Sequence, residues 1–384
     1  MTRGPGLERR LLTEAARDFA ERRIAPETSG EQLTADAARR LVREAAGLGL
    51  PGLLIPESFG GSGGGYLDHA VATEELGAVD AGFAAGLSLT ASVPDLVLAA
   101  GTDRQRRDWL PGVAEGTTIL AGALNEPSVS GSELFDPAAE PGSRMRTRAE
   151  RTGTSYVISG SKAQWVTNAG IADAYLVFAR AEAGPTVFWV PADAPGLTVG
   201  PRSHLLGLRG GFHAELFLDE VRVPASARIG PEGEGLRLLM TTTPGMAVGL
   251  AAVFVGVARA AYEAALAHTG TRTSWGRPLR EHQAVALALA EMAVELRTAR
   301  LLVHDAAAAL DAKADPSELA LVVPAAKTRA VDAAISCAQH AVRLHGATGV
   351  TAGSAPERLL RDAWTGYACD FTREMLHLGI ATTL

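Results

Sequence analysis

Residues 174–190 have the sequence AYLVFARAEAGPTVFWV, and this stretch determines how the chain is organised. Two runs rich in β-branched and aromatic residues, at 174–178 and 186–190, are separated by a segment that contains Gly184 and Pro185. Such runs bounded by turn residues are typical of successive β-strands. Further along, Ala214–Val223 alternates apolar with polar residues, as a half-buried strand does. The centre of the chain is therefore predicted to be a β-domain.

Helical spacing occurs on both sides of these strands. Apolar residues recur at three- and four-residue steps from Leu7 to Phe19, which predicts a helix that Pro26 ends. Thr34, followed by alanines, is expected to begin the next helix. Towards the C-terminus, four long helical segments with short connections predict an antiparallel bundle. They lie near residues 246–270, 281–312, 316–345 and 355–378.

Length and composition fit a protein with several domains. A chain of 384 residues allows two or three, and 47% hydrophobic with 21% charged residues is the globular range. We predict an α+β protein with an N-terminal α-helical domain, a middle β-barrel or sandwich domain and a C-terminal four-helix bundle. The expected bounds are 1–118, 119–235 and 236–384.

Several classes of protein are disfavoured. The net charge of −7 argues against a nucleic-acid binder, and two cysteines without a Cys-x-x-Cys motif indicate neither a disulfide framework nor a metal site. The N-terminus carries charges of both signs and no apolar signal segment. The longest apolar run, Met246–Ala258, is shorter than the ~20 residues of a membrane span. We expect a cytoplasmic protein with no membrane segment.

Five short motifs follow one another along nearly the whole chain. They are Asn125-Glu126-Pro127 with a Ser/Gly-rich loop up to Ser132, Trp165-Val166-Thr167-Asn168, Arg272 to Arg277 with Glu281-His282-Gln283, His345 to Gly349, and Arg361-Asp362-Ala363. Each motif is weak alone, but together and in this order they resemble the acyl-CoA dehydrogenase family of flavoenzymes. The resemblance implies the three-domain fold, FAD as cofactor, and a homo-oligomer, either a dimer or a homotetramer.

The resemblance also assigns residues to the flavin. Trp165 and Thr167 would flank the isoalloxazine, with the Thr167 hydroxyl at N5, and Asn125 would meet the pyrimidine edge. Ser132 corresponds to the loop serine at the pyrophosphate. A flavin needs such hydrogen-bonding partners and an aromatic or apolar wall. Taken singly, each residue has a plainer interpretation, such as Trp165 in a β-domain core; the set in family order favours flavin binding.

Family members bind each flavin between two subunits, which implies a second group of cofactor residues. Arg272 would neutralise the pyrophosphate, Trp275 would pack near the adenine half, and Gln283 would hydrogen-bond the cofactor. The remaining candidates are Arg343, Gly346 and Thr372. Arg343 stands where the family usually has a glutamine, and a cation there favours an anionic ligand. Gly346 would let the backbone approach the cofactor closely, or would simply end a helix.

The catalytic position is unusual. Most family members have a glutamate followed by Gly-Thr just after Arg-Asp-Ala, and here Asp370, Phe371 and Thr372 occupy those places. Asp370 would therefore remove the α-proton of an acyl thioester while the β-hydride passes to the flavin. Its side chain is one C–C bond, about 1.5 Å, shorter than glutamate. Arg373 and Glu374 are expected one turn beyond Asp370 on the same helix.

Three functions remain open from the sequence. The first is α,β-dehydrogenation of an acyl-CoA or of an acyl group on a carrier protein, with an electron-transfer flavoprotein or oxygen as final acceptor. The second is a flavin oxidase of the nitroalkane oxidase type, whose base is also an aspartate at this position. The third is a non-catalytic or partner subunit of a heteromeric acyl-CoA dehydrogenase, in which Asp370 is an ordinary helix residue.

Overall fold

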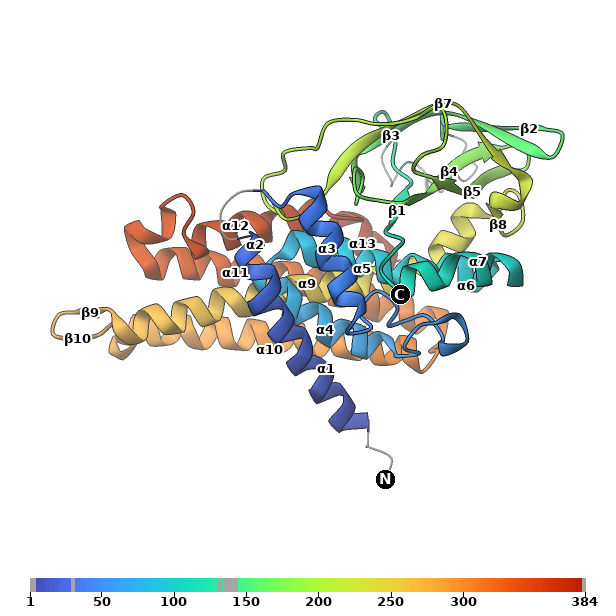
Figure 1. The fold of residues 1–384 in the computed structure, drawn as a ribbon. Helices are drawn as coiled ribbons and strands as arrows, with labels where there is room; N and C mark the ends of the chain where they lie inside the picture. Colours follow the sequence, from blue (N-terminus) through green and yellow to red (C-terminus); the bar gives the residue numbers. More distant parts are fainter. Residues whose placement is uncertain (1–4, 29–31, 130–132, 134–143, 382–384) are drawn as a thin grey trace.

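The computed structural model describes residues 5–28, 32–129, 133 and 144–381. In Figure 1 the strands form a separate domain that lies against a larger helical body, and the N-terminal helices cross the long helices of the C-terminal bundle. The predicted α+β architecture of helical, β and helical domains is confirmed.

Helices joined by short connections make up the N-terminal domain. Thr34 begins a helix as predicted, because its hydroxyl accepts a hydrogen bond from the Ala37 N–H at 3.2 Å. Pro26 does not end the first helix. The helical backbone continues to Thr28, since the turn before the proline is π-helical and Pro26 lies in the first turn of α2, where proline is tolerated. The bounds are α1 (Pro5–Phe19), η1 (Ala20–Ile24), α2 (Ala25–Thr28), α3 (Ala35–Ala46), η2 (Glu57–Phe59), α4 (Tyr66–Val79), α5 (Ala81–Ser92), α6 (Pro94–Ala100) and α7 (Asp103–Ala114).

The middle domain is an eight-stranded sheet. Its order is β6-β7-β3-β2-β4-β5-β8, and β1 pairs with β4 in parallel. The two runs within residues 174–190 pair as an antiparallel hairpin, from Ala174 opposite Pro191 to Ala181 opposite Gly184. The bounds are β1 (Leu120–Ala123), β2 (Arg148–Thr152), β3 (Ser155–Thr167), β4 (Ala174–Ala181), β5 (Gly184–Pro191), β6 (Leu197–Val199), β7 (His213–Pro224), η3 (Ala225–Ala227) and β8 (Arg228–Ile229).

The C-terminal domain is built on three long helices and a broken fourth. A hairpin of β9 and β10 joins α9 to α10 and projects from one end of the bundle (Figure 1). The bounds are α9 (Gly235–Thr271), β9 (Thr273–Ser274), β10 (Arg277–Pro278), η4 (Leu279–Glu281), α10 (Gln283–Asp311), α11 (Pro316–His345), η5 (Gly346–Val350), α12 (Ala355–Thr365), η6 (Gly366–Ala368) and α13 (Arg373–Ala381).

The fourth predicted helix, 355–378, is interrupted in the segment that contains the candidate base, Asp370. Helix α12 ends at Thr365, and α13 begins at Arg373. Asp370 between them has a φ of 56°, a left-handed conformation that a right-handed helix excludes. The expectation that Asp370 shares a helix with Arg373 and Glu374 is therefore wrong.

Two helical stretches are long and apolar enough to cross a membrane, by length and composition alone. They are Ala81–Ala100, which covers α5 and α6, and Gly235–Thr271, which is α9. Most of their residues are buried inside the protein, and Val253, Phe254 and Val257 of α9 belong to the main hydrophobic core. They serve as core helices of this fold.

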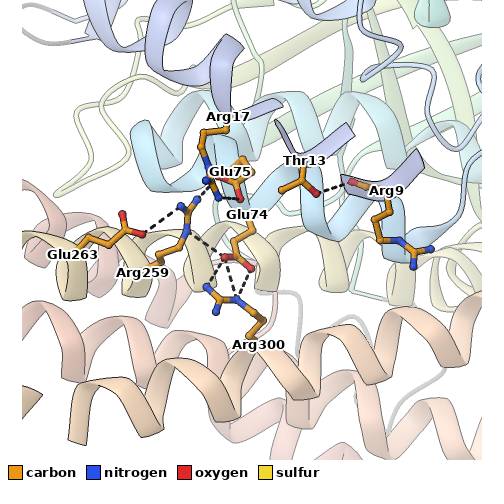
Figure 2. A network of polar contacts seen from close by, with 8 residues as sticks. All are labelled: Arg9, Thr13, Arg17, Glu74, Glu75, Arg259, Glu263 and Arg300. Atoms are coloured by element: carbon orange, nitrogen blue, oxygen red, sulfur yellow. Dashed lines mark hydrogen bonds and ion pairs between the residues drawn. The ribbon is translucent and has the colours of Figure 1, made fainter. Parts of the chain in front are cut away.

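A buried ionic network joins α4 to three other helices (Figure 2). The Glu75 carboxylate accepts hydrogen bonds from Arg17 of α1 at 2.9 and 3.0 Å and from Arg259 of α9 at 2.6 Å. Glu74 accepts from Arg300 of α10 at 2.7 Å. The side chains of Glu74 and Glu75 are only 9% and 5% exposed, respectively. Charges removed from water in this way need partners, so the network fixes the N-terminal domain on the bundle.

Candidate active site

Two adjoining cavities, of about 140 and 390 Å³, lie where the three domains meet. Four residues predicted for the site line both cavities: Asn125, Trp165, Thr167 and Asp370. They come from the segment after β1, from the end of β3 and from the break between α12 and α13. Residues separated by up to 245 positions in the sequence are thus brought to one place.

Strand β3 carries Trp165 and Thr167 and is fixed at its end by Asn168. The backbone of Asn168 is left-handed, with a φ of 69°, and its buried amide Nδ2 donates to the carbonyl oxygens of Gly86 at 2.9 Å and Leu120 at 2.8 Å. These bonds hold the end of β3 between α5 and β1. The side chain of Trp165 is 53% exposed at the cavities, so it is not the core residue of the plainer interpretation.

Asn125 is held by the buried pair that flanks it. Lys162, which is fully buried, donates from Nζ to the Leu124 carbonyl oxygen at 3.1 Å and to Glu126 Oε1 at 3.0 Å. Ala163 N–H donates to the Asn125 carbonyl oxygen at 2.9 Å. The side-chain Oδ1 of Asn125, by contrast, is buried without a hydrogen-bond partner in the described structure. A buried acceptor of this kind requires a donor, so Asn125 is suited to a ligand that presents an N–H or O–H.

Asp370 faces both cavities from a loop that a buried lysine holds in place. Lys327 of α11, 2% exposed, donates from Nζ to the carbonyl oxygens of Cys369 and Phe371, the second at 2.7 Å. The protein packed around Asp370 raises the pKa of its carboxyl, and the Lys327 ammonium opposes that shift. A carboxylate with a raised pKa is suited to act as a general base near neutral pH.

Lys327 has no part in the predicted site, although it holds the loop of the candidate base, Asp370. Its sequence signal is weak: a single lysine within the Ala-rich face of a helix, where a buried charge needs partners from elsewhere in the fold.

Apolar side chains from three helices form most of the remaining wall. Leu89 and Leu96 come from α5 and α6, and Leu239 and Met246 from α9. Phe371, which follows the candidate base, also lines the smaller cavity. Such a wall accommodates an aliphatic chain.

A second group of predicted residues lies at the end of the bundle, outside these cavities. Arg272 ends α9, and Trp275, 93% exposed with a φ of 54°, lies at the tip of the β9–β10 hairpin. The rings of His268 and His345 stack with centroids 4.1 Å apart, which brings the end of α11 beside the end of α9. Gly346 has a φ of 61° and a ψ of −135°, a conformation that glycine alone adopts readily.

None of the remaining predicted cofactor residues that the structure describes lines either cavity. Gln283 and Arg343 are exposed at the start of α10 and near the end of α11, away from both cavities. Thr372 does not line either cavity; its hydroxyl accepts from the Met375 N–H at 3.3 Å at the start of α13. Ser132 lies outside the described residues.

Comparisons with known proteins agree with this arrangement. Models of the N-terminal, middle and C-terminal domains of acyl-CoA dehydrogenase match residues 7–117, 121–221 and 233–384. The chain is 33% identical to a probable acyl-CoA dehydrogenase, YngJ, of Bacillus subtilis, over 98% of both chains. Among solved structures, butyryl-CoA dehydrogenase from Megasphaera elsdenii has a TM-score of 0.91 at 29% identity, over 100% of this chain and 99% of that one. A glutaryl-CoA dehydrogenase from Mycobacterium smegmatis in complex with FADH2 has a TM-score of 0.87 at 30% identity, over 98% and 94%. The chain belongs to the acyl-CoA dehydrogenase family.

Proposed function

We propose that this protein catalyses the FAD-dependent α,β-dehydrogenation of an acyl thioester, carried on CoA or on a carrier protein, with Asp370 as the base. The observation that carries the proposal is the meeting of the Asp370 carboxylate with Asn125, Trp165 and Thr167 around cavities whose remaining wall is largely apolar. The carboxylate supplies the base, the three other residues suit a flavin, and the apolar wall suits an acyl chain.

The cofactor residues support FAD on their own chemistry. The buried Asn125 Oδ1 needs a donor, which the pyrimidine N–H of a flavin offers, and the exposed ring of Trp165 presents an aromatic face. The Thr167 hydroxyl adds a hydrogen-bonding group on the same strand. FAD, when bound, supplies the acceptor for the hydride that leaves the β-carbon.

The chain's own residues account for the proton. Asp370 would take the α-proton on its carboxylate, and Lys327 keeps the carboxylate's loop in place through the two flanking carbonyl oxygens. The leucines and Phe371 give the smaller cavity an apolar wall against which an acyl chain can pack. An electron-transfer flavoprotein or oxygen would take the electrons after this step.

A second copy of the chain would complete the site. Arg272 follows α9, Trp275 lies in the β9–β10 hairpin and Gln283 begins α10, and none of the three lines the cavities of its own chain. The hairpin projects from one end of the bundle (Figure 1), so these residues would serve a neighbouring subunit's cofactor. Leu287, Val294 and Leu301 of α10 are 64%, 64% and 50% exposed at seven-residue spacing, so they form one apolar stripe. We propose that such surfaces pair in a cytoplasmic homotetramer.

The test is anaerobic reduction of the flavin by a panel of acyl thioesters. Bleaching by one thioester would support the dehydrogenase, and replacing Asp370 by asparagine should then slow reduction by about 10²–10⁴-fold, the usual contribution of a general base. Glu374→Gln is the matched control, because Glu374 is an exposed carboxylate that hydrogen-bonds Tyr367 and lines neither cavity.

Other outcomes would overturn the proposal. An unchanged rate in Asp370→Asn refutes the base. Reduction by a nitroalkane and by no thioester would indicate an oxidase, and a purified protein that does not bind added FAD would indicate a partner subunit.

A further inference from the structure

The larger cavity has a polar patch on its α5 side. Ala85, Ser88, Leu89 and Ser92 of α5 line it, and only Leu89 also lines the smaller cavity. Behind Ser88 lies His69 of α4, whose Nε2 is 2.9 Å from the Ser88 hydroxyl oxygen. The two residues are 5% and 3% exposed. A purely aliphatic acyl chain would need no such group in its binding cavity.

The imidazole of His69 is neutral, because burial lowers its pKa to about 4. A neutral ring nitrogen either accepts a hydrogen bond from the Ser88 hydroxyl or donates one to it. In the first case the serine oxygen keeps lone pairs for a ligand, and in the second its hydrogen is free to be donated. The pair leaves Ser88 with hydrogen-bonding capacity on the side of the cavity in either arrangement.

Helix α9 holds this pair in place. A Cβ atom added at Gly249 would lie 2.3 Å from the Ser88 hydroxyl oxygen and 2.8 Å from His69 Nε2. The glycine therefore lets the backbone of α9 pack directly against the pair. Ser92, one helical turn after Ser88 in the same cavity wall, is different: its hydroxyl donates to the Ser88 carbonyl oxygen at 2.8 Å within α5.

The charges around the cavity restrict the ligand further. Among the described residues that line it there is no lysine or arginine, and the ionisable groups are Asp370, His213 and Cys369. Burial and the nearby Arg202 lower the pKa of His213 to about 4, so His213 adds no positive charge near neutral pH. A carboxylate placed here would have no cation and would share the cavity with Asp370, which is unfavourable.

We propose that the Ser88–His69 pair recognises a neutral hydroxyl group on the acyl chain of the substrate, in place of the terminal methyl of a simple fatty acyl group. The inference rests on the proposed thioester dehydrogenation and names its substrate class. A hydroxyl group both donates and accepts, so it matches Ser88 in either arrangement of the pair, whereas a methyl group leaves that capacity unused in a buried site.

Three matched series of CoA thioesters test the proposal on the FAD-loaded enzyme: ω-hydroxyacyl, the acyl group with methyl in place of the hydroxyl, and the ω-carboxyl analogue. Dissociation constants are measured by calorimetry on the FAD-loaded Asp370→Asn enzyme, in which proton removal is blocked, and flavin bleaching is followed in parallel on the wild type. At one chain length the hydroxyl series should bind about tenfold to a hundredfold more tightly than the methyl series, the effect expected of one buried hydrogen bond. The carboxyl series should bind most weakly.

Two variants test whether the Ser88–His69 pair causes the tighter binding of the hydroxyl series. Ser88→Ala should bring the ratio of hydroxyl to methyl affinity close to one, while Ser92→Ala, which changes a neighbouring hydroxyl of the same cavity, should leave the ratio as it is. The proposal is overturned if the methyl or the carboxyl series binds best at every acyl chain length. It is also overturned if Ser88→Ala leaves the ratio of hydroxyl to methyl affinity unchanged. If no thioester bleaches the flavin, the dehydrogenase function fails, and the affinity ratios still decide the role of Ser88.

Discussion

Replacing Lys327 by methionine should impair the proposed base, Asp370, without changing that residue itself. The lysine side chain is 2% exposed and donates to the carbonyl oxygens of Cys369 and Phe371, on either side of Asp370. Methionine has similar length and fits an apolar site, but it removes both hydrogen bonds and the positive charge. Two carbonyl oxygens are then left without this donor, and the left-handed backbone of Asp370 loses its main restraint.

The structure gives the expected sizes. A hydrogen bond with a charged donor contributes about 1.5–3 kcal/mol, so losing two should lower the free energy of unfolding by about 3 kcal/mol or more. A shift of the carboxylate by about 1 Å would slow flavin reduction by about 10²-fold. The Lys327 charge lowers the pKa of Asp370, so removing it should raise that pKa further. Because the base works only when deprotonated, the acidic limb of the pH–rate profile should move to higher pH.

Single-turnover flavin reduction measured against pH separates these effects. Lys327→Gln keeps an uncharged NH2 group that can still donate hydrogen bonds, so its acidic limb should move as in the methionine variant while its rate at high pH falls less. Lys327→Arg keeps the charge, so its acidic limb should stay near that of the wild type even if packing lowers the rate. A folded, FAD-loaded Lys327→Met enzyme with an unmoved acidic limb would refute the electrostatic part of the reasoning, and an unchanged rate at high pH would refute the positioning part.

Three further predictions concern stability and assembly. Arg259→Leu leaves the buried carboxylates of Glu74 and Glu75 with one partner fewer each, and urea unfolding should show a loss of about 3–5 kcal/mol; a loss well under 1 kcal/mol would contradict the role of the network. Burial raises the pKa of Asp95 from 3.8 to about 7, although the hydrogen bond from Tyr66 opposes this, so the native state prefers the protonated carboxyl and wild-type stability falls as pH rises through that interval. Asp95→Asn should therefore gain stability over the wild type from about pH 4 to 7, by at most about 4 kcal/mol, and parallel pH curves of the two proteins would exclude this. Leu301→Glu should dissociate the proposed tetramer in light-scattering measurements; a tetramer that persists would place the interface elsewhere.

Local patterns predict the parts of the fold that local forces determine. The hairpin within residues 174–190 follows from its β-branched and aromatic runs, and Thr34 begins α3 because an N-cap acts on the next three residues. The break at Asp370 has another cause. Apolar residues continue at helical spacing on both sides of it, and the donor that stabilises the break, Lys327, lies 43 positions earlier in the chain. No pattern within 355–378 contains that information.

In the candidate site too, sequence motifs predict some residues, while others depend on contacts between distant segments. The family motifs place Asn125, Trp165 and Thr167 together with Asp370, and the structure brings all four to the same cavities. Periodicity alone would leave Trp165 in a strand without a role. Ser88 and His69 are missed for a physical reason: they lie on two different helices, and their pairing exists only after α4, α5 and α9 pack together.

The arrangement around Asp370 bears on whether the chain is an enzyme or a non-catalytic subunit. Keeping Lys327 charged and buried is costly, and burial lowers its pKa accordingly. The buried ammonium donates to the two carbonyl oxygens that flank Asp370. Asp370 itself has a strained, left-handed backbone and lines the cavities. A subunit with no chemistry to perform would be more stable with an apolar residue in place of Lys327 and a continuous helix in place of the break. Strain maintained at a cavity-lining carboxylate is what a working base requires, and this favours the dehydrogenase over the partner subunit.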